Sequence, residues 1–419
     1  LYGDVVAVVA ARTRKEARAA AAKVKINYEP LPAYLTFPDA AAEDAVRIHE
    51  NSPNVYIEQP LFKGEETPAL FETAAYSVEG AFSTVREPHL PLEPDNAQAY
   101  WGENGMMVVH CKNQNLYGSI SNFAEAIGLP KNKIRMVQNE SGGSFGYSLS
   151  AQMPALAAAC AMALDAPVSL VLSYPEHQHF TGKRAASYTN ARLACDSSGR
   201  ITALEFHSGL DHGAYSDVSL SLASKSVRFF GIPYNIPNIR GLSRICFSNG
   251  NFGVAYRAFA SPQAFTVGES LVDMLAVKAG IDPFEFRYIN AAVEGDLTPN
   301  STSYRHYPMR KMLDMMRPYY KEWKEEAKSK STADKKYGVG IGFGGYHVGK
   351  PNDSAQAALE LNDDGSVTHS CTWEDVGQGG DIGALTHTLT YLRELNLTPD
   401  RVHLVQNDTY TCPNGGSAS

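Results

Sequence analysis

The stretch NESGGSFGYS, residues 139–148, joins two segments of different character. IRMVQ (134–138) before it is typical of a strand, and the alanine-rich MPALAAACAMAL (153–164) after it is typical of a helix. The junction holds one aromatic residue, Phe145, among the glycines Gly142, Gly143 and Gly146. Glycine lets backbone N–H groups approach a ligand, and a following helix adds a partial positive charge. Such a junction suits a phosphate or another oxyanion, although glycine marks tight turns without a ligand just as readily.

This junction and the hairpin upstream of it occur twice in the sequence. Two hairpins, QAYWGENGMMVVHC (98–111) and ALELNDDGSVTHSC (358–371), have glycine in the last turn position, where a positive φ is needed. In both, a Gln-bearing polar loop, a helix, a proline and a strand ending in Val-Gln-Asn follow. Each strand leads into Gly-Gly-Ser, at 142–144 and at 415–417. The ordered series predicts two similar lobes whose glycine-rich junctions converge on one bulky anionic cofactor.

Composition narrows the classes of partner. The 419 residues suffice for two or three domains, and the formal net charge of −8 argues against nucleic acid or an anionic membrane as partner. No apolar run approaches the roughly 18–20 residues of a membrane span. The six cysteines show no CxxC or CxxH spacing, which argues against an iron–sulfur or zinc site within this chain. Free cysteines indicate a reducing compartment, so we expect a cytoplasmic protein.

The sequence lacks the motifs of several common nucleotide-binding, catalytic and metal sites. SGGSFG lacks the Gly-Lys-Ser/Thr ending of a P-loop, and no GxGxxG follows a strand of a βαβ unit, so ATP and NAD are poor candidates. No HExxH or GxSxG is present. His177 and His179 have no third metal ligand at a useful spacing, and an exposed polar strand end is the favoured interpretation there.

The pattern along the chain predicts an α+β fold. VVAVVA (5–10) predicts a strand, and a helix follows in which Thr13 and Glu16 have capping-box spacing. A second short strand is expected to end at EPLP (29–32). Residues 36–72, rich in Pro, Asn and Glu, predict a connecting segment. A third hairpin, ARLACDSSGRITALEF, lies at 191–206, a charged helix is expected at 308–328, and a boundary at 331–338.

Nine motifs then identify a family. They are, in chain order, YGDVVAVVA, EPDNAQAYW, NQN, GGSFG, DHGAYS, YNIPNIR, AYRAFASPQ, GIDPFEFRYINA and EDVGQGGD. Together they resemble the molybdenum hydroxylases, the xanthine dehydrogenase and aldehyde oxidoreductase family, over nearly the whole chain. PNVYIEQP, FTGKR and WEDVGQG resemble the bacterial aldehyde oxidoreductase branch, which carries molybdopterin cytosine dinucleotide.

The resemblance implies a molybdopterin-binding domain with two similar lobes around the cofactor. On this basis residues 1–35 end a small α/β hammerhead-like domain, and 36–72 connect it to the first molybdopterin-binding lobe, 73–330. Residues 331–419 begin the second lobe. Both ends of the sequence resemble cuts through folded domains, and we expect the family's general base, a Glu, to lie beyond Ser419.

The resemblance also assigns roles to residues that would surround the cofactor. The family's GGxFG loop over the molybdenum corresponds to Gly142, Gly143, Ser144, Phe145 and Gly146, with Phe145 as an apolar wall beside the metal. Gln114 matches the Gln that bonds an apical oxo ligand. The metal–dithiolene side corresponds to Arg257 and Ala258, the pterin contact to Gly377, Gln378 and Gly379, and the phosphate or dinucleotide tail to Ser417 and Ser419. Read singly, Gln114 could cap a helix, Arg257 could form a structural ion pair and Phe145 could be core.

Three positions depart from the family pattern. Leu149 stands where some purine hydroxylases have a carboxylate that holds the purine, which favours a less polar substrate such as an aldehyde. Ala260 replaces the usual Gly in RAFASPQ. Lys225 lies about where purine enzymes have a substrate-binding Arg, and its role stays open.

The resemblance therefore implies the molybdenum-binding part of an oxidoreductase that converts aldehydes to carboxylic acids with water as oxygen source. This part would be catalytically incomplete without the missing Glu. Iron–sulfur clusters and any flavin would lie on other domains or partner subunits, and the complete enzyme would be a homodimer. Two alternatives remain: a subunit of a split nicotinate or purine hydroxylase, and a cofactor-free scaffold subunit.

Overall fold

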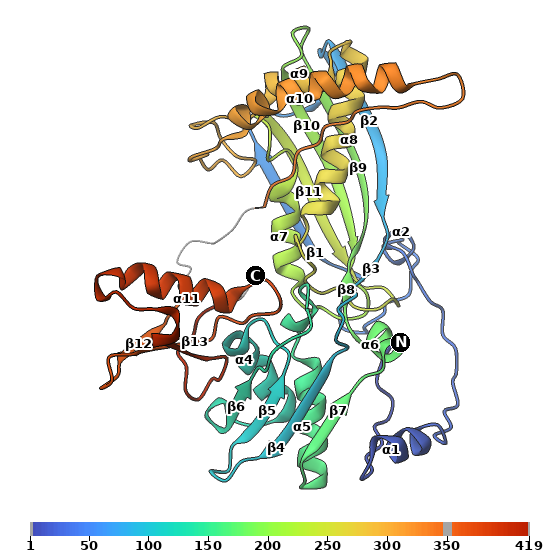
Figure 1. The fold of residues 1–419 in the computed structure, drawn as a ribbon. Helices are drawn as coiled ribbons and strands as arrows, with labels where there is room; N and C mark the ends of the chain where they lie inside the picture. The colour runs from blue at the N-terminus through green and yellow to red at the C-terminus, as the bar shows by residue number, and fades with distance from the viewer. Residues whose placement is uncertain (1–2, 347–353, 418–419) are drawn as a thin grey trace.

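A computed structural model of the chain describes residues 3–346 and 354–417. Three larger sheets organise these residues, each with helices packed against it (Figure 1). A five-stranded sheet forms the upper half, a four-stranded sheet lies below it, and a three-stranded sheet lies at the left, beside the four-stranded one. The mixed α and β fold predicted from the sequence is confirmed.

The five-stranded sheet contains one parallel pair among antiparallel neighbours. The parallel strands are β10 and β11, and helix α7 (Ser219–Phe229) makes the crossover that parallel strands require. The hairpin predicted at 191–206 forms β9 and β10. In spatial order the strands are β1 (Val55–Lys63), β11 (Asn238–Cys246), β10 (Ile201–Asp211), β9 (Ala186–Cys195) and β2 (Tyr76–Thr84).

Helices α7 and α8 (Ser261–Ala279) cover one face of this sheet and close the main core. Leu204 and Phe206 of β10 and Leu271 and Leu275 of α8 are at most 2% exposed. Each such side chain contributes about 1.5–3 kcal/mol by burial. Helices α9 (Pro283–Asn290) and α10 (Met309–Lys330) lie across the top of the molecule in Figure 1. The helix expected at 308–328 is therefore confirmed.

The four-stranded sheet carries helices α4 and α5, and its strands are ordered β6-β5-β4-β7. Met107, Leu116, Phe123 and Met136 are fully buried between the sheet and the helices. The bounds are β4 Asn96–Trp101, β5 Met107–Cys111, α4 Leu116–Ile127, β6 Ile134–Val137, α5 Gln152–Leu164 and β7 Val168–Val171. Short strands β3 (Glu87–Pro88) and β8 (Lys183–Arg184) pair between the four-stranded and five-stranded sheets.

The three-stranded sheet follows the same path as part of the four-stranded one. Hairpin β4–β5, helix α4 and parallel strand β6 correspond to hairpin β12–β13, helix α11 and parallel strand β14. The duplication predicted from the sequence is confirmed at this level. The bounds are β12 Ala358–Leu361, β13 Val367–Cys371, α11 Gly380–Tyr391 and β14 Val402–Gln406.

A hydrogen-bonded seam joins the two copies, between residues 135–138 and residues 407–409. Val137 and Asp408 form an antiparallel bridge, and the Gln138 amide donates to the Asn407 carbonyl at 2.9 Å. Arg135 pairs with Asp408 at 2.5 Å beside this bridge. The end of β6, before the first glycine-rich junction, therefore lies next to the residues that follow β14, before the second junction.

The N-terminal expectation is partly wrong. Helix α1 (Arg14–Ala21) forms with the predicted capping box, in which the Glu16 amide donates to Thr13 Oγ1 at 3.2 Å. Residues 5–10 and 29–32, expected in strands, are irregular, and the Val6 side chain is 61% exposed. An apolar run becomes a strand only when another strand pairs with it, and no segment within 3–346 or 354–417 pairs with these residues.

The expected connecting segment, 36–72, also differs from the prediction. It contains the short helices α2 (Phe37–Ala40) and α3 (Pro68–Glu72), and between them strand β1, which pairs with β11 over its whole length. This segment therefore builds the edge of the five-stranded sheet as well as linking two regions.

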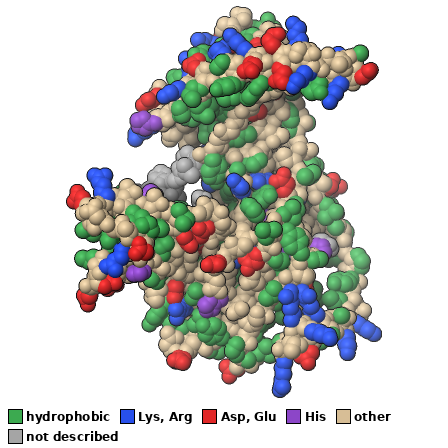
Figure 2. All heavy atoms as spheres, in the orientation of Figure 1, with side chains coloured by type: hydrophobic (Ala, Val, Ile, Leu, Met, Phe, Trp, Pro, Cys, Tyr) green, Lys and Arg blue, Asp and Glu red, His purple; other side chains and the backbone are tan. Residues whose placement is uncertain are grey.

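The surface shows where charge gathers. Figure 2 shows Lys and Arg side chains together at the lower right, around α1, and both signs mixed along α10 at the top. Among the helices of residues 3–346 and 354–417, none combines the length and the apolar character needed to cross a membrane.

Candidate functional site

The two glycine-rich junctions meet at Gln114. Ser144, in the first junction, donates from Oγ to Gln114 Oε1 at 2.5 Å. Ser417, in the second junction, donates from Oγ to the Gln114 backbone carbonyl at 3.2 Å. Gln114 lies between β5 and α4 and is 7% exposed. The convergence of the junctions that the sequence predicted is therefore present. Ser419 lies outside the described residues.

Loop 142–147, which runs from Gly142 to Tyr147, has a backbone that only glycine adopts easily. Gly143 and Gly146 have φ angles of 100° and 119°. A Cβ added to Gly146 would lie 2.5 Å from the Ala255 carbonyl oxygen, so this glycine also permits a close backbone approach. Phe145 itself has φ 62° and its side chain is 40% exposed, which is unusual for a large apolar residue beside a core.

The amides of loop 142–147 fit an anionic ligand. Within the described part of the chain, no residue accepts a hydrogen bond from the amides of Gly143, Ser144 or Phe145. The neighbouring amides are engaged, because Gly142 donates to Glu93 Oε2 at 2.8 Å and Gly146 to Ser144 Oγ at 3.2 Å. Three successive amides are thus available to oxygen atoms of a bound group.

The segment containing Arg257 touches loop 142–147 through its backbone. The Arg257 amide donates to the Phe145 carbonyl at 2.7 Å, and the Arg257 carbonyl accepts from Arg184 Nη2 at 2.8 Å. Ala258 and Ala260 have φ angles of 62° and 70°, and such left-handed non-glycine residues cluster at functional sites. Ala260 is the N-cap of α8, which begins at Ser261. The side chains of Arg257 and Ala258 are exposed.

The Gly377–Gly379 loop is closed on itself by Asp375. Gly377 and Gly379 donate their amides to Asp375 Oδ1 at 2.8 and 3.3 Å. Burial raises the pKa of Asp375, and the backbone donors outweigh it, so the pKa lies below its usual value. Gln378 accepts from the Val376 amide at 2.7 Å, so part of its side chain is used within the loop.

The same loop is attached to the first lobe. Gln138 Nε2 donates to the Asp375 carbonyl at 3.1 Å, and the Leu116 amide, at the start of α4, donates to Glu374 Oε1 at 3.0 Å. Glu374 and Asp375 begin the motif EDVGQGGD, but no role was assigned to them from the sequence. The available signal was an Asp two residues before a glycine, a spacing at which the carboxylate bonds its own backbone.

Lys225 lies beside the Arg257 segment. Its Nζ donates to the Tyr346 hydroxyl at 2.7 Å and lies 5.9 Å from the Phe259 ring centroid. The ammonium therefore faces the aromatic rings of Phe259 and Tyr346, beside Ala258 and Ala260.

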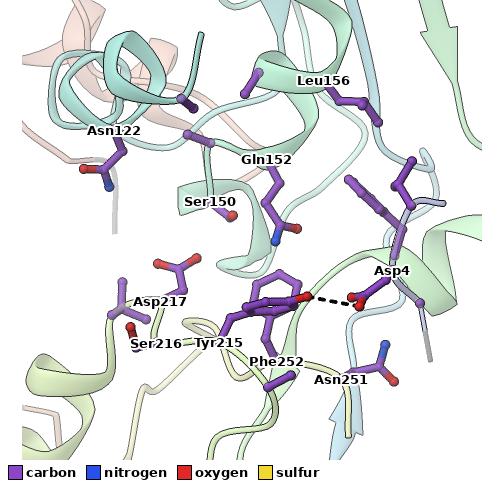
Figure 3. A pocket seen from close by; sticks show the side chains of 18 of the residues that line it. Asp4, Asn122, Ser150, Gln152, Leu156, Tyr215, Ser216, Asp217, Asn251 and Phe252 are labelled. Carbon is purple, nitrogen blue, oxygen red and sulfur yellow. Dashed lines mark hydrogen bonds between the residues drawn. The ribbon is translucent and has the colours of Figure 1, made fainter. Parts of the chain in front are cut away.

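A cavity of about 1010 Å³ opens beside the residues that follow loop 142–147. Figure 3 shows Ser150 and Gln152 on one side, Asp217 and Tyr215 on another, and the Tyr215 hydroxyl donating to Asp4 at 3.0 Å. Burial raises the pKa of Asp217, and a hydrogen bond with Ser150 opposes this. The apolar part of the cavity lining includes Leu149, Leu156 and Phe252.

Four buried titratable groups near the junctions have shifted pKa values. Burial lowers the pKa of His89 to about 3 and those of His177 and His212 to about 4. Burial raises the pKa of Asp95 to about 7. Near pH 5 the histidines are neutral and Asp95 is protonated in the folded protein, whereas unfolding reverses all four states.

These shifts predict that the protein loses stability as the pH falls from 6 to 5. Unfolding takes up three protons at the histidines and releases one at Asp95, a net uptake of about two, so the free energy of unfolding should fall by about 3 kcal/mol per pH unit. Denaturant titrations at both pH values measure this. Asp95→Asn removes the opposing group and should steepen the slope. An equal or shallower slope in that variant would contradict the assignment of Asp95.

Comparisons with known proteins agree with this geometry. A family model described as a molybdopterin cofactor-binding domain matches residues 48–291, and a second with the same description matches residues 315–419. The aldehyde oxidoreductase of Megalodesulfovibrio gigas is 42% identical over 416 residues, which are 99% of this chain and 46% of that protein. The nicotinate dehydrogenase large molybdopterin subunit of Eubacterium barkeri is 30% identical over 69% of this chain and 68% of that subunit.

A solved structure shows the same fold. The crystal structure of the aldehyde oxidoreductase from Desulfovibrio desulfuricans matches with a TM-score of 0.94 and 42% identity, over 97% of this chain and 45% of that one. The chain thus spans a little under half the length of these aldehyde oxidoreductases. Duplicated lobes, converging glycine junctions and free amides fit the cofactor that both family models describe. The chain belongs to the molybdopterin cofactor-binding domains of the molybdenum hydroxylase family.

Proposed function

We propose that this chain is the cofactor-binding part of an enzyme that hydroxylates aldehydes to carboxylic acids, with water as the oxygen source. The observation that carries the choice of substrate is Leu149. It lines the cavity beside loop 142–147, at the position where some purine hydroxylases have an anchoring carboxylate. An apolar side chain there favours an aldehyde over a polar heterocycle, because Leu149 offers no hydrogen bond to replace those that a polar ring would lose to water at this position.

The residues around Gln114 would hold the molybdopterin. Gly142, Gly143, Phe145 and Gly146 would form its cover, and the free amides of the loop would donate to its oxygen atoms. Gln114 would bond an oxygen on the metal. Arg257 and Ala258 would lie at the dithiolene side, Gly377, Gln378 and Gly379 at the pterin, and Ser417 and Ser419 at the phosphate or dinucleotide tail. When bound, the molybdenum supplies an acceptor for the two electrons that leave the substrate.

The remaining parts of the reaction would lie outside the residues described. We propose that the tail is cytosine dinucleotide, that the general base is a Glu beyond Ser419, and that electrons leave through an iron–sulfur domain or subunit. We propose further that the complete enzyme is a cytoplasmic homodimer. The 42% identity to an aldehyde oxidoreductase supports these four proposals on the tail, the base, the electron path and the assembly.

A split N-heterocycle hydroxylase is the second candidate. It is favoured by the 30% identity to a nicotinate dehydrogenase subunit and by the ammonium of Lys225 beside Phe259, which could bond a polar ring. Initial rates of the complete enzyme on a panel of aldehydes and on nicotinate and purines separate the two. Faster turnover of the heterocycles would overturn the aldehyde assignment, and absence of molybdenum from the native protein would favour a scaffold.

Arg257→Ala in the complete enzyme is expected to lower molybdenum content or turnover about tenfold, which corresponds to 1.4 kcal/mol of lost interaction. The exposed guanidinium makes no contact that the fold needs, since the attachment to Phe145 and Arg184 uses the Arg257 backbone. Metal analysis and steady-state rates measure the effect. Arg228→Ala, at another exposed arginine on α7, is the control. Unchanged metal content together with unchanged rates in Arg257→Ala would contradict the assignment.

A further inference from the structure

One buried ammonium connects the two ends of loop 142–147, one end directly and the other through Glu93. Lys112 Nζ donates to the Tyr147 hydroxyl at 2.9 Å, at the end of the loop. It also donates to the Glu93 carbonyl at 2.9 Å and pairs with Glu93 Oε2 at 3.1 Å. The Lys112 side chain is 2% exposed, so these three oxygens provide the hydrogen bonds that a buried ammonium requires.

Glu93 carries this contact to the start of the loop. Its carboxylate accepts from the Gly142 amide at 2.8 Å, and its own amide donates to the Gly142 carbonyl at 3.2 Å. A Cβ on Gly142 would lie 2.5 Å from Glu93 Cβ, so the two backbones are as close as glycine allows. Asn96 Nδ2 bonds the other carboxylate oxygen at 2.8 Å, which fixes the Glu93 side chain.

Tyr147 is equally constrained at the other end. It is 2% exposed, and its ring makes edge contacts with His89 and His177, with centroids 5.5 and 4.9 Å away. Its hydroxyl therefore has little freedom to follow a displaced Lys112. The amides of Gly143, Ser144 and Phe145 lie between these two fixed ends.

We propose that Lys112 is a positioning residue that sets the conformation of loop 142–147 and so aims its free amides at the cofactor. This rests on the proposed cofactor role of the loop. Lys112 does not touch the loop's free amides, and it acts through Glu93 and Tyr147. It also lies two residues before Gln114, so one short segment after β5 both shapes the loop and carries the glutamine that the two junctions share.

The test compares Lys112→Met with Lys112→Arg in the complete enzyme. Hydrogen–deuterium exchange, followed by mass spectrometry, is measured for peptides covering 139–150 and for strand β10. In Lys112→Met the hydrogen-bonded amides of the loop, those of Gly142 and Gly146, should exchange about tenfold faster while β10 is unchanged. The rate of pterin release into excess buffer should rise about tenfold or more, as for other residues that support a ligand set. Lys112→Arg, which keeps the charge, should restore part of both effects.

Two further variants keep the test decisive. Lys183→Met removes another buried ammonium, bonded to Thr181 rather than to the loop, and should leave exchange in 139–150 unchanged. If Lys112→Met does not fold, Tyr147→Phe removes one acceptor and keeps the ring, and should speed exchange about threefold in the loop alone. Unchanged loop exchange, or exchange that rises equally in β10, would overturn the proposal. Hydrogen–deuterium exchange of residues 139–150 can also be measured in protein that holds no cofactor. The positioning role of Lys112 is therefore tested even if the proposed cofactor role of the loop is wrong.

Discussion

Gly146→Ala should remove most of the bound molybdopterin from the complete enzyme while leaving the rest of the chain folded. The new Cβ would lie 2.5 Å from the Ala255 carbonyl oxygen, and the φ angle of 119° is one that alanine rarely adopts. Backbone strain of this kind costs about 1–3 kcal/mol, and the backbone must shift to relieve the overlap. A loss of cofactor affinity of about tenfold to a hundredfold follows, since every 1.4 kcal/mol is tenfold.

Pterin and molybdenum content per protein, with circular dichroism as a check on folding, measure this result. Gly128→Ala is the matched control, because Gly128 also has a positive φ, 71°, but a Cβ there would meet nothing within 4 Å. It ends α4, so that variant should lose some stability and retain its cofactor. Full cofactor content in Gly146→Ala would show that the close approach to Ala255 does not shape the site.

Arg287→Met should reduce the free energy of unfolding by about 3–5 kcal/mol, the usual loss when one partner of a buried ion pair is removed. Arg287 is fully buried, and its guanidinium bonds Glu269 at 2.9 Å and Asp273 at 2.6 Å. Glu269 also accepts from the Tyr234 hydroxyl at 2.6 Å and the Phe343 amide at 2.8 Å. Removing the arginine leaves a carboxylate on α8 without its cation at the centre of this network.

Denaturant titration of the purified protein measures the loss. The control is Lys330→Met, whose partner Glu326 lies one turn away on the exposed face of α10, where such a pair contributes well under 1 kcal/mol. Similar stability losses in the two variants would mean that burial of Arg287 does not determine the value of its ion pairs.

Local chemistry made the duplicated unit predictable from sequence. Gly105 and Gly365 are turn residues with φ angles of 71° and 77°, so each hairpin could be read from a few neighbouring residues. Strand β1 was missed because the segment that contains it, 36–72, is rich in Pro, Asn and Glu and suggested a connection. Pro60 is tolerated there because β1 is an edge strand of the five-stranded sheet, where proline removes no interior hydrogen bond.

The candidate site could be predicted only in part for a similar reason. Gln114, Phe145 and the glycines were found because they belong to ordered motifs in the sequence. Lys112 was not, and Glu93 was given no role although it begins the motif EPDNAQAYW, because the importance of both depends on contacts with residues 35–49 positions away, which no local pattern encodes. Residues 5–10 show the opposite error: a good strand sequence stayed irregular because β structure depends on a neighbour.

The seam between residues 135–138 and 407–409 bears on how the holoenzyme matures. Backbone hydrogen bonds and the Arg135–Asp408 pair fasten the halves, and Gln138 of this seam also accepts from the Asn113 amide, next to Gln114. A domain hinge could not open there without breaking sheet-like pairing. We therefore expect the two halves to keep their mutual orientation when the prosthetic group enters or leaves the site.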